Sequence, residues 1–380
     1  MKRISIAPRA DWQKKVEEVG LIYHHTEGRP YWNESAYYSF RSSEIDRIEV
    51  ASNELQQMCL EAAQHIIDNN RFDDLTIPAA AVPFIKQAWE DEPPALYGRF
   101  DLAYDGEHLK LLEYNADTPT ALVEAAVAQW YWLQERFPHL DQFNSVHEKL
   151  LAKWQDLKPY LANPTHFTYL PPPDKENSED LMTVTYLMDL AGQAGIHSSL
   201  VEIDEIGWDA DRNSFVDQTD NPIRSIFKLY PWEWLVRDPF AENFFASYNM
   251  TQWIEPIWKM LLSNKGILPI LWELFPHHAN LLECSFGEPR KMTDYVKKPL
   301  LSREGANLSI HRGVVVQETG GLYGEEGFVY QAMARVANYN GAYPIIGSWM
   351  VDGVAAGIGI RESDTPVTNN LSSFVPHLFE

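Results

Sequence analysis

The sequence predicts a mixed fold in which an α+β arrangement is combined with an α/β unit. Three patterns predict it. Apolar residues recur near the helical period in the first part of the chain, a strand–turn–strand pattern spans residues 97–115, and strand, helix and strand patterns alternate over residues 164–203. We expect the alternating segment to form a parallel sheet and the C-terminal third to add further strands.

The segment before the hairpin is expected to be mostly helical. Residues 11–70 are predicted to be largely helix, because the stretch that opens at Ser42 places Ile45 and Ile48 at helical spacing. A pair of asparagines ends this stretch. A shorter helix is expected over residues 78–96, between proline-marked loops.

A β-hairpin is predicted over residues 97–115. Residues 97–104 alternate like a strand, Asp105-Gly106 is a strong turn signal, and residues 109–115 form the returning strand. A helix over residues 121–135 should follow, so the expected order is hairpin, loop, helix.

The next part of the chain alternates between the two periods. A strand over 166–170, a helix over 178–194 capped by Ser178 and a strand over 197–203 indicate a parallel, Rossmann-like unit. The Gly-x-Gly-x-x-Gly turn is missing from it, so the sequence does not support a dinucleotide site.

The C-terminal third is predicted to hold one helix and several strands. The expected elements are a helix over 268–275, a strand ending near Lys298, a glycine-bearing loop over 302–307, and strands over 313–317, 328–336 and 344–351.

Composition excludes some classes of partner. With 31 basic and 54 acidic residues the formal net charge is −23, which repels nucleic acid and anionic lipid; solubility alone is an equally simple reason for it. The two cysteines form no metal or disulfide pattern, and no signal peptide or long apolar span is recognised, so a cytoplasmic location is expected.

Four side chains of the hairpin are the first candidates for chemistry. Arg99 and Asp101 share one strand face, and so do Glu113 and Asn115, because residues two apart point the same way. If the register permits, two carboxylates and an amide lie beside a guanidinium, a set suited to Mg²⁺ and a transferring phosphoryl group. An ordinary ion pair on a solvent-facing hairpin is the alternative.

Two separated lysines and a glycine loop fit a nucleotide site. Lys265 and Lys298 would supply charge near phosphates, with Gly305 in a mobile cover over them. Solvated surface groups are the more frequent role for single lysines. No P-loop motif is present, and the tryptophan-rich segment 230–234 suits either a cleft or the core.

The chain resembles the synthetase domain of the glutathionylspermidine synthase family, which consists of ATP-grasp-type carboxylate–amine ligases. The likeness spans nearly all 380 residues, and within the family it is to members that lack an amidase. Its anchors are Arg99-Phe100-Asp101, Glu113-Tyr114-Asn115-Ala116-Asp117, Ser263-Asn264-Lys265, Pro276-His277-His278 and Val296 to Asn307.

The resemblance implies that ATP lies between antiparallel sheets beside a Rossmann-like pre-ATP-grasp unit. It divides the single domain 1–380 into helices and metal hairpin (1–160), the pre-ATP-grasp unit (161–250) and the nucleotide-binding part (251–380). It also implies residue roles: Asp101, Glu113 and Asn115 as ligands of two Mg²⁺ ions; Arg99 and Arg361 on the transferring phosphoryl; and Phe100, Lys265, Lys298, Gly305 and Gln331 around ATP.

The implied reaction passes the γ-phosphoryl to a small, peptide-like carboxylic acid, and an amine then displaces phosphate. Thr118, Thr120, Glu179 and Asp180 match substrate positions. Pro119, Leu229 and Ile345 depart from the family pattern and count against glutathione and spermidine themselves. Glutathionylspermidine synthesis proper and a nucleotide-binding regulator without turnover are the two alternatives.

Overall fold

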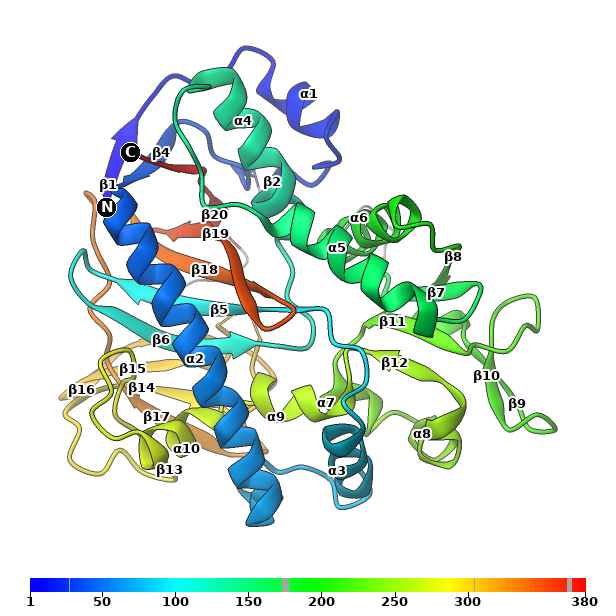
Figure 1. Cartoon of the computed structure of the whole chain (residues 1–380). Coiled ribbons are helices and arrows are strands. Elements are labelled where there is room, and N and C mark those ends of the chain that lie inside the picture. Colours follow the sequence, from blue (N-terminus) through cyan, green and yellow to red (C-terminus); the bar gives the residue numbers. More distant parts are fainter. Residues whose placement is uncertain (27, 173–177, 304, 368–370) are drawn as a thin grey trace.

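A five-stranded antiparallel sheet forms the centre of the computed structural model, which describes residues 1–26, 28–172, 178–303, 305–367 and 371–380 (Figure 1). The predicted hairpin forms one side of this sheet, with bounds that match the expectation. The strand order is β20 (Ser373–Phe374), β19 (Val354–Ser363), β18 (Tyr343–Val351), β5 (Tyr97–Tyr104) and β6 (Leu109–Asn115).

The long helix α2 (Ser42–Asp68) crosses this central sheet, as Figure 1 shows. Its apolar side carries Ile45, Ile48 and Leu55 into the core, and the Ser52 hydroxyl lies 2.7 Å from that of Ser348 on β18. The helix therefore fixes the outer face of the central sheet and leaves the opposite face to other elements.

A second antiparallel sheet contains the expected C-terminal strands except the one predicted over 344–351, which is β18 of the central sheet. The helix α10 (Ile267–Leu274), predicted within a residue, packs against its strands β13 and β17. The order is β13 (Cys284–Phe286), β17 (Phe328–Ala332), β14 (Asp294–Pro299), β15 (Ser309–Arg312) and β16 (Val314–Glu318).

The alternating segment forms a four-stranded parallel sheet, as its pattern predicts. Its crossover helix α6 (Glu179–Gln193) begins after Ser178, whose hydroxyl accepts a hydrogen bond from the Leu181 amide at 3.1 Å. The strand order is β12 (Gln252–Ile254), β11 (Ser225–Leu229), β7 (Thr165–Tyr169) and β8 (Ser198–Glu202).

The prediction of helix over residues 11–70 is confirmed for Ser42–Asp68 and wrong for residues 11–41, which are not mostly helical. After α1 (Trp12–Glu17) the chain makes the short pair β2 (His25–Thr26) and β3 (Arg29–Pro30) and then β4 (Ala36–Phe40). Strand β4 pairs with β1 (Lys2–Ser5) and, in parallel, with β21 (His377–Phe379). A partner more than 330 residues away in the sequence leaves no local signal.

Short elements complete the fold around these sheets. The helix expected over 121–135 contains a π-helical turn at Glu124–Ala128, and β9 (Gly207–Asp209) pairs with β10 (Ser214–Val216) in a separate two-stranded sheet. The remaining helices are α3 (Val82–Asp91), α4 (Gln129–Arg136), α5 (Val146–Leu157), α7 (Trp232–Leu235), α8 (Ala241–Ser247) and α9 (Met260–Ser263). No helix in the described ranges has both the length and the apolarity to cross a bilayer.

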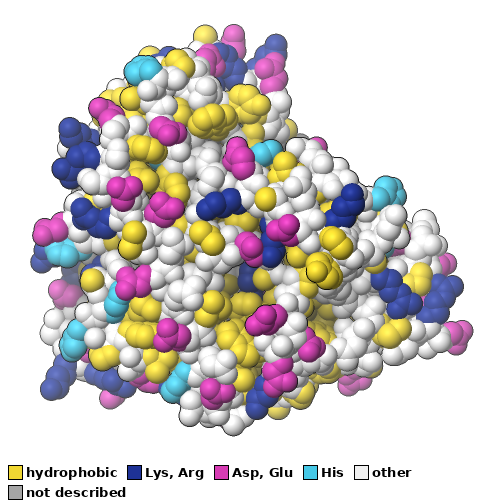
Figure 2. Space-filling view, viewed as in Figure 1, with side chains coloured by type: hydrophobic (Ala, Val, Ile, Leu, Met, Phe, Trp, Pro, Cys, Tyr) yellow, Lys and Arg dark blue, Asp and Glu magenta, His cyan; other side chains and the backbone are white. Residues whose placement is uncertain are grey.

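The surface mixes charges of both signs. On the face shown in Figure 2, Lys and Arg side chains are scattered among Asp and Glu, with apolar side chains between them. This face has no basic stripe that would follow a phosphate backbone.

Candidate active site

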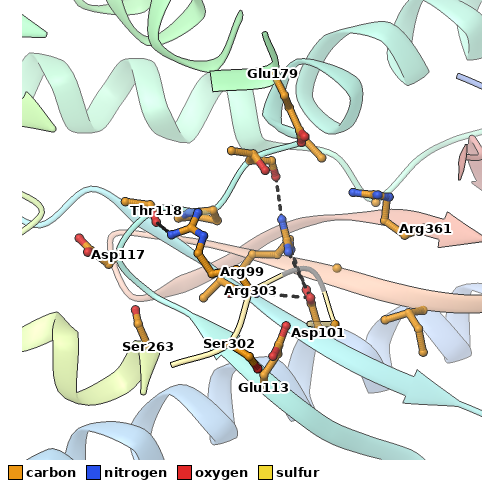
Figure 3. Close-up of a pocket in the computed structure, with 18 of the residues that line it drawn as sticks. Arg99, Asp101, Glu113, Asp117, Thr118, Glu179, Ser263, Ser302, Arg303 and Arg361 are labelled. Atoms are coloured by element: carbon orange, nitrogen blue, oxygen red, sulfur yellow. Dashed lines mark hydrogen bonds and ion pairs between the residues drawn. The ribbon is translucent and has the colours of Figure 1, made fainter. Parts of the chain in front are cut away.

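A cavity of about 450 Å³ lies where the three sheets meet. Its walls come from the hairpin β5–β6, strands β18 and β19, the loop after β6, the start of α6, and residues 301–305 after β14. Polar and charged side chains from these elements converge in Figure 3. Residues far apart in the sequence therefore line one cavity.

The hairpin register brings its four candidate side chains together. Asp101 pairs with Glu113 and Arg99 with Asn115, with a bulge directly after Asp101. Arg99 Nε and Nη2 lie 2.6 and 3.1 Å from the Asp101 carboxylate oxygens, and Asn115 Nδ2 lies 3.3 Å from Oδ2. The Arg99–Asp101 ion pair does form, but it lines the cavity and is not on an open surface.

Phe100 faces the other side of the same strand. Its ring is fully buried and stacks on Tyr114 at a centroid distance of 3.9 Å. Only its main chain is oriented for a role next to Arg99 and Asp101, and the ring instead holds the two hairpin strands in register.

Both candidate lysines are buried, so their interpretation as solvated surface groups is wrong. Lys265 Nζ lies 2.9 Å from Glu113 Oε2 and donates to the Ser302 carbonyl. Lys298 Nζ donates to Gln331 Oε1 at 2.7 Å and to the Leu112 carbonyl at 3.0 Å. Two ammonium groups thus point inward beside one carboxylate.

These contacts change the acidity of the groups that make them. Burial alone would raise the pKa of Glu113, but the charges of Lys265 and Lys298 outweigh it and lower that pKa to about 2. Burial lowers the pKa of Lys298 to about 8, against the attraction of Glu113. Burial raises the pKa of Asp101, although the Arg99 guanidinium opposes that rise.

A smaller, mostly apolar chamber of about 90 Å³ adjoins the cavity. The two share Asp101, Glu113 and Lys265, and Gln331 lies in the wall of the smaller one, where its Nε2 donates to the Leu111 carbonyl. Its apolar lining includes Leu112, Val296, Ile310, Met333, Ile345 and Val367. An apolar group that carries a charged one would meet matching side chains in the chamber and the cavity.

The predicted substrate residues are only partly gathered. Thr118, Thr120 and Glu179 line the cavity, while Asp180 is not part of its described lining. Gly305 and Arg361 line it as well, and the Arg361 guanidinium lies 5.3 Å from the Tyr31 ring centre. The role of each residue stays a prediction.

Several cavity residues were not predicted. Tyr31 comes from the stretch expected to be helical, and Arg303 donates to Thr118 Oγ1 at 2.9 Å while lying over the Trp234 ring. In the tryptophan-rich segment, Trp232 packs in the core and Glu233 lines the cavity. Asp117 and Arg303 stood in motifs that carry the family resemblance, and Glu233 stood in the tryptophan-rich segment, so each had a signal in the sequence.

The donor set suits magnesium better than a transition metal. No cluster of three or more His, Cys, Asp or Glu able to hold a metal occurs in the described part of the chain. Two carboxylates and an amide remain, and Mg²⁺ is commonly held by one or two carboxylates together with substrate phosphates. The residues present therefore fit Mg²⁺ bound along with a nucleotide.

Comparison with known proteins agrees with this chemistry. The family model described as glutathionylspermidine synthase preATP-grasp matches residues 3–380. A Haemophilus influenzae protein named as a candidate acid–amine ligase is 42% identical, with the whole of both chains covered. The Escherichia coli bifunctional glutathionylspermidine synthetase/amidase is 27% identical over 90% of this chain and 58% of its own length.

The fold is also found among solved structures. A glutathione synthetase-like effector from Globodera pallida superposes with a TM-score of 0.61 at 10% identity, covering 97% of this chain and 96% of its own. This likeness concerns the fold alone.

Fold, site and relatives together define an ATP-dependent ligase that forms carbon–nitrogen bonds. The chain belongs to the glutathionylspermidine synthase family.

Proposed function

We propose that this ligase activates a small carboxylic acid as an acyl phosphate and joins it to an amine, using ATP and Mg²⁺. One observation supports this most: Asp101, Glu113 and Lys265 line both the polar cavity and the apolar chamber that adjoins it. Arg99 lies on the cavity side of this boundary and Lys298 on the chamber side. The chamber then takes the adenine and the cavity takes the phosphates and the acid.

Each group has a part in this proposal. Lys265, Lys298 and the Gly305 loop bind the phosphates, and Gln331 contacts the adenine side. Arg99 and Arg361 neutralise charge on the transferring phosphoryl group, and Thr118, Thr120, Glu179 and Asp180 bind the acid and the amine. Asp101, Glu113 and Asn115 would hold two Mg²⁺ ions, which offset phosphate charge when bound.

Arg99 is well placed for such a task. It is anchored by Asp101 on one side and by the Thr120 carbonyl, 2.7 Å from its Nη1, on the other. A guanidinium held at both ends needs little reorganisation when charge develops beside it. An acyl phosphate formed there would have to react with the amine before water hydrolyses it.

In the proposed ligase the two antiparallel sheets are an ATP-grasp pair and the parallel sheet is the pre-ATP-grasp unit, with sub-units 1–160, 161–250 and 251–380. The amino-acid departures at Pro119, Leu229 and Ile345 favour an acid–amine pair other than glutathione and spermidine. A regulator without turnover would have no need to keep all three cations beside both carboxylates.

The test is ADP formation from Mg²⁺·ATP with pools of amines and of small peptidic acids, followed by mass spectrometry of the products. The proposal predicts ADP release that requires one acid and one amine together, with an amide product of matching mass. ADP release without any amide, or Mg²⁺·ATP binding with no turnover in any pool, would contradict it; the second result favours the regulator.

A further inference from the structure

The loop that follows the hairpin is anchored at each of its four residues, 117–120. Its last three residues are held from the hairpin and from the loop after β14: Thr118 Oγ1, the Pro119 carbonyl and the Thr120 carbonyl accept hydrogen bonds from Arg303, Tyr97 and Arg99, at 2.9, 3.2 and 2.7 Å. All four residues line the cavity.

The first residue, Asp117, is held by a different part of the molecule. Its Oδ1 lies 2.6 Å from Lys228 Nζ, and its Oδ2 accepts from the Trp232 amide at 2.8 Å. Lys228 is fully buried and Asp117 nearly so. The ammonium also donates to the Tyr230 carbonyl at 3.0 Å and lies 4.3 Å from the Trp232 ring centre.

This ion pair joins two sheets. Lys228 is the penultimate residue of β11, so it lies at the carboxyl end of an inner strand of the parallel sheet, where ligands of such sheets bind. Asp117 comes two residues after Asn115, and the Ala116 amide between them donates to Ser263 Oγ at 3.1 Å. The pair therefore sets how the end of the metal hairpin lies against the parallel sheet.

We propose that Lys228 is a positioning residue of the ligase site, which holds the acid-binding loop 117–120 in place through its buried contact with Asp117. The inference rests on the proposed function for the role of the loop. Lys228 itself is not part of the described cavity lining, so it acts through Asp117. A buried charge whose partner is removed is strongly unfavourable, and loss of Lys228 should displace the carboxylate and the loop with it.

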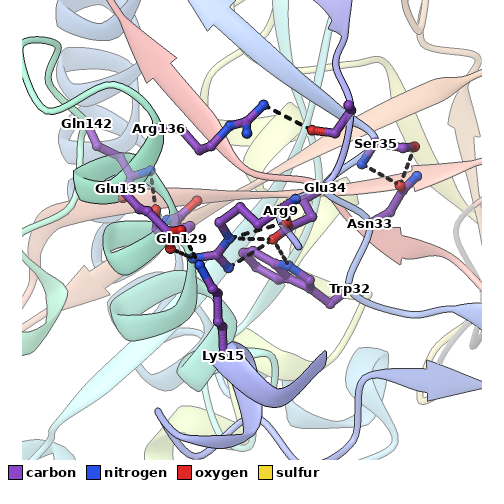
Figure 4. A network of polar contacts seen from close by, with 11 residues as sticks. Arg9, Lys15, Trp32, Asn33, Glu34, Ser35, Gln129, Glu135, Arg136 and Gln142 are labelled. Atoms are coloured by element: carbon purple, nitrogen blue, oxygen red, sulfur yellow. Dashed lines mark hydrogen bonds and ion pairs between the residues drawn. The ribbon is translucent and has the colours of Figure 1, made fainter. Parts of the chain in front are cut away.

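Three variants separate positioning from stability. Lys228→Met removes the ammonium and leaves Asp117 unpaired. Adding Asp117→Asn removes the unpaired charge, but the loop still lacks its ionic contact with residue 228. Arg9→Met is the matched control, because Arg9 and Glu34 form a buried ion pair (2.9 Å) in the network of Figure 4, in the N-terminal part of the chain and outside the cavity lining.

Amide hydrogen exchange of residues 116–122 is the first readout, and it needs no substrate. We expect exchange there to be at least about tenfold faster in Lys228→Met and also in the double variant, whereas the unfolding midpoint falls clearly in the single variant only. Arg9→Met should lower the midpoint without changing exchange in this segment. Wild-type exchange at 116–122 in the double variant, or an equal change in Arg9→Met, would overturn the inference.

The second readout links the loop to the substrate. With the acid that drives ADP formation, the double variant should need at least about tenfold more acid for half-saturation, while its calorimetric Kd for Mg²⁺·ATP stays within about threefold. An unchanged acid requirement would overturn the role in substrate binding. A wild-type protein that binds no Mg²⁺·ATP would refute the proposed function. The exchange measurements on the loop do not depend on nucleotide binding, so the two failures can be told apart.

Discussion

Glu113 is one of two carboxylates that lie among three cationic side chains. Its carboxylate contacts Lys265 and feels the charge of Lys298, while Asp101 is paired with Arg99. Three cations face two carboxylates, so the cluster carries about one net positive charge when all five groups are ionised. The phosphates of ATP would bring negative charge to a site that already has these cations in place, and Mg²⁺ bound with them would offset part of that charge.

Removing either carboxylate charge should stop the reaction without unfolding the protein. Asp101→Asn frees Arg99, and Glu113→Gln leaves Lys265 without its ionic partner, so we expect Mg²⁺-dependent ADP formation to fall by at least about a hundredfold in each. Circular dichroism should show native folding. Glu107→Gln, at the exposed turn of the same hairpin, is the control and should keep full activity. Normal turnover in Glu113→Gln would show that Glu113 has no role in the reaction.

Strand β18 has a glycine, Gly347, next to the site, and the absence of a side chain there leaves room for Arg99. Gly347 pairs with Asp101, and a Cβ at this glycine would come within 2.8 Å of Arg99 Cδ. Real Cβ atoms do not approach so closely, so Arg99 lies across the strand only because this position is glycine. The neighbouring strand thus determines the path of the guanidinium toward Asp101 and Thr120.

Gly347→Ala should therefore displace Arg99 and lower ADP formation by about tenfold or more, while the unfolding midpoint changes by only a few degrees. Steady-state kinetics and thermal unfolding check the two parts. Gly192→Ala in α6, where a Cβ meets nothing within 4 Å, is the control and should be fully active. A fully active Gly347→Ala enzyme would show that the path of Arg99 is unimportant.

Strand β21 makes folding sensitive to acid. His377 is fully buried; burial lowers its pKa from 6.5 to about 3, and its Nδ1 lies 2.9 Å from Gln129 Oε1. Nε2 has no hydrogen-bond partner within the described structure, so a proton there would be a buried, unsolvated charge.

As the pH falls below 6.5, His377 is protonated in the unfolded chain but stays neutral in the folded protein. The free energy of unfolding is therefore unaffected by protonation of His377 above pH 6.5 and decreases as the pH falls toward 3. The loss is at most about 1.4 kcal/mol per pH unit. His377→Gln should weaken the fall in the denaturant midpoint between pH 7 and 5, whereas His139→Gln, at an exposed position, should not. Equal pH dependence in wild type and His377→Gln would contradict this.

At the scale of the whole molecule, the site is a junction of three sheets built from distant segments. Local patterns were enough for the hairpin, α2, α6 and α10, because each carries its own turn, cap or apolar period. The pairing of β4 with β21, and the cavity positions of Tyr31 and Arg303, depend on partners that no local pattern reveals. The hairpin candidates were predictable because a local strand pattern places them on one face. Lys228 was not, because its partner Asp117 is 111 residues away in the sequence.

The central claim is that the acid becomes an acyl phosphate. Incubating the enzyme with Mg²⁺·ATP, the amine pool and acids labelled with ¹⁸O in their carboxylates, and then recording the ³¹P spectrum of the phosphate released, tests it most directly. The account predicts one ¹⁸O in the phosphate for each ADP formed, because the oxygen that attacks the γ-phosphorus leaves with it. ADP accompanied by unlabelled phosphate would mean that water attacks ATP, and would contradict the account.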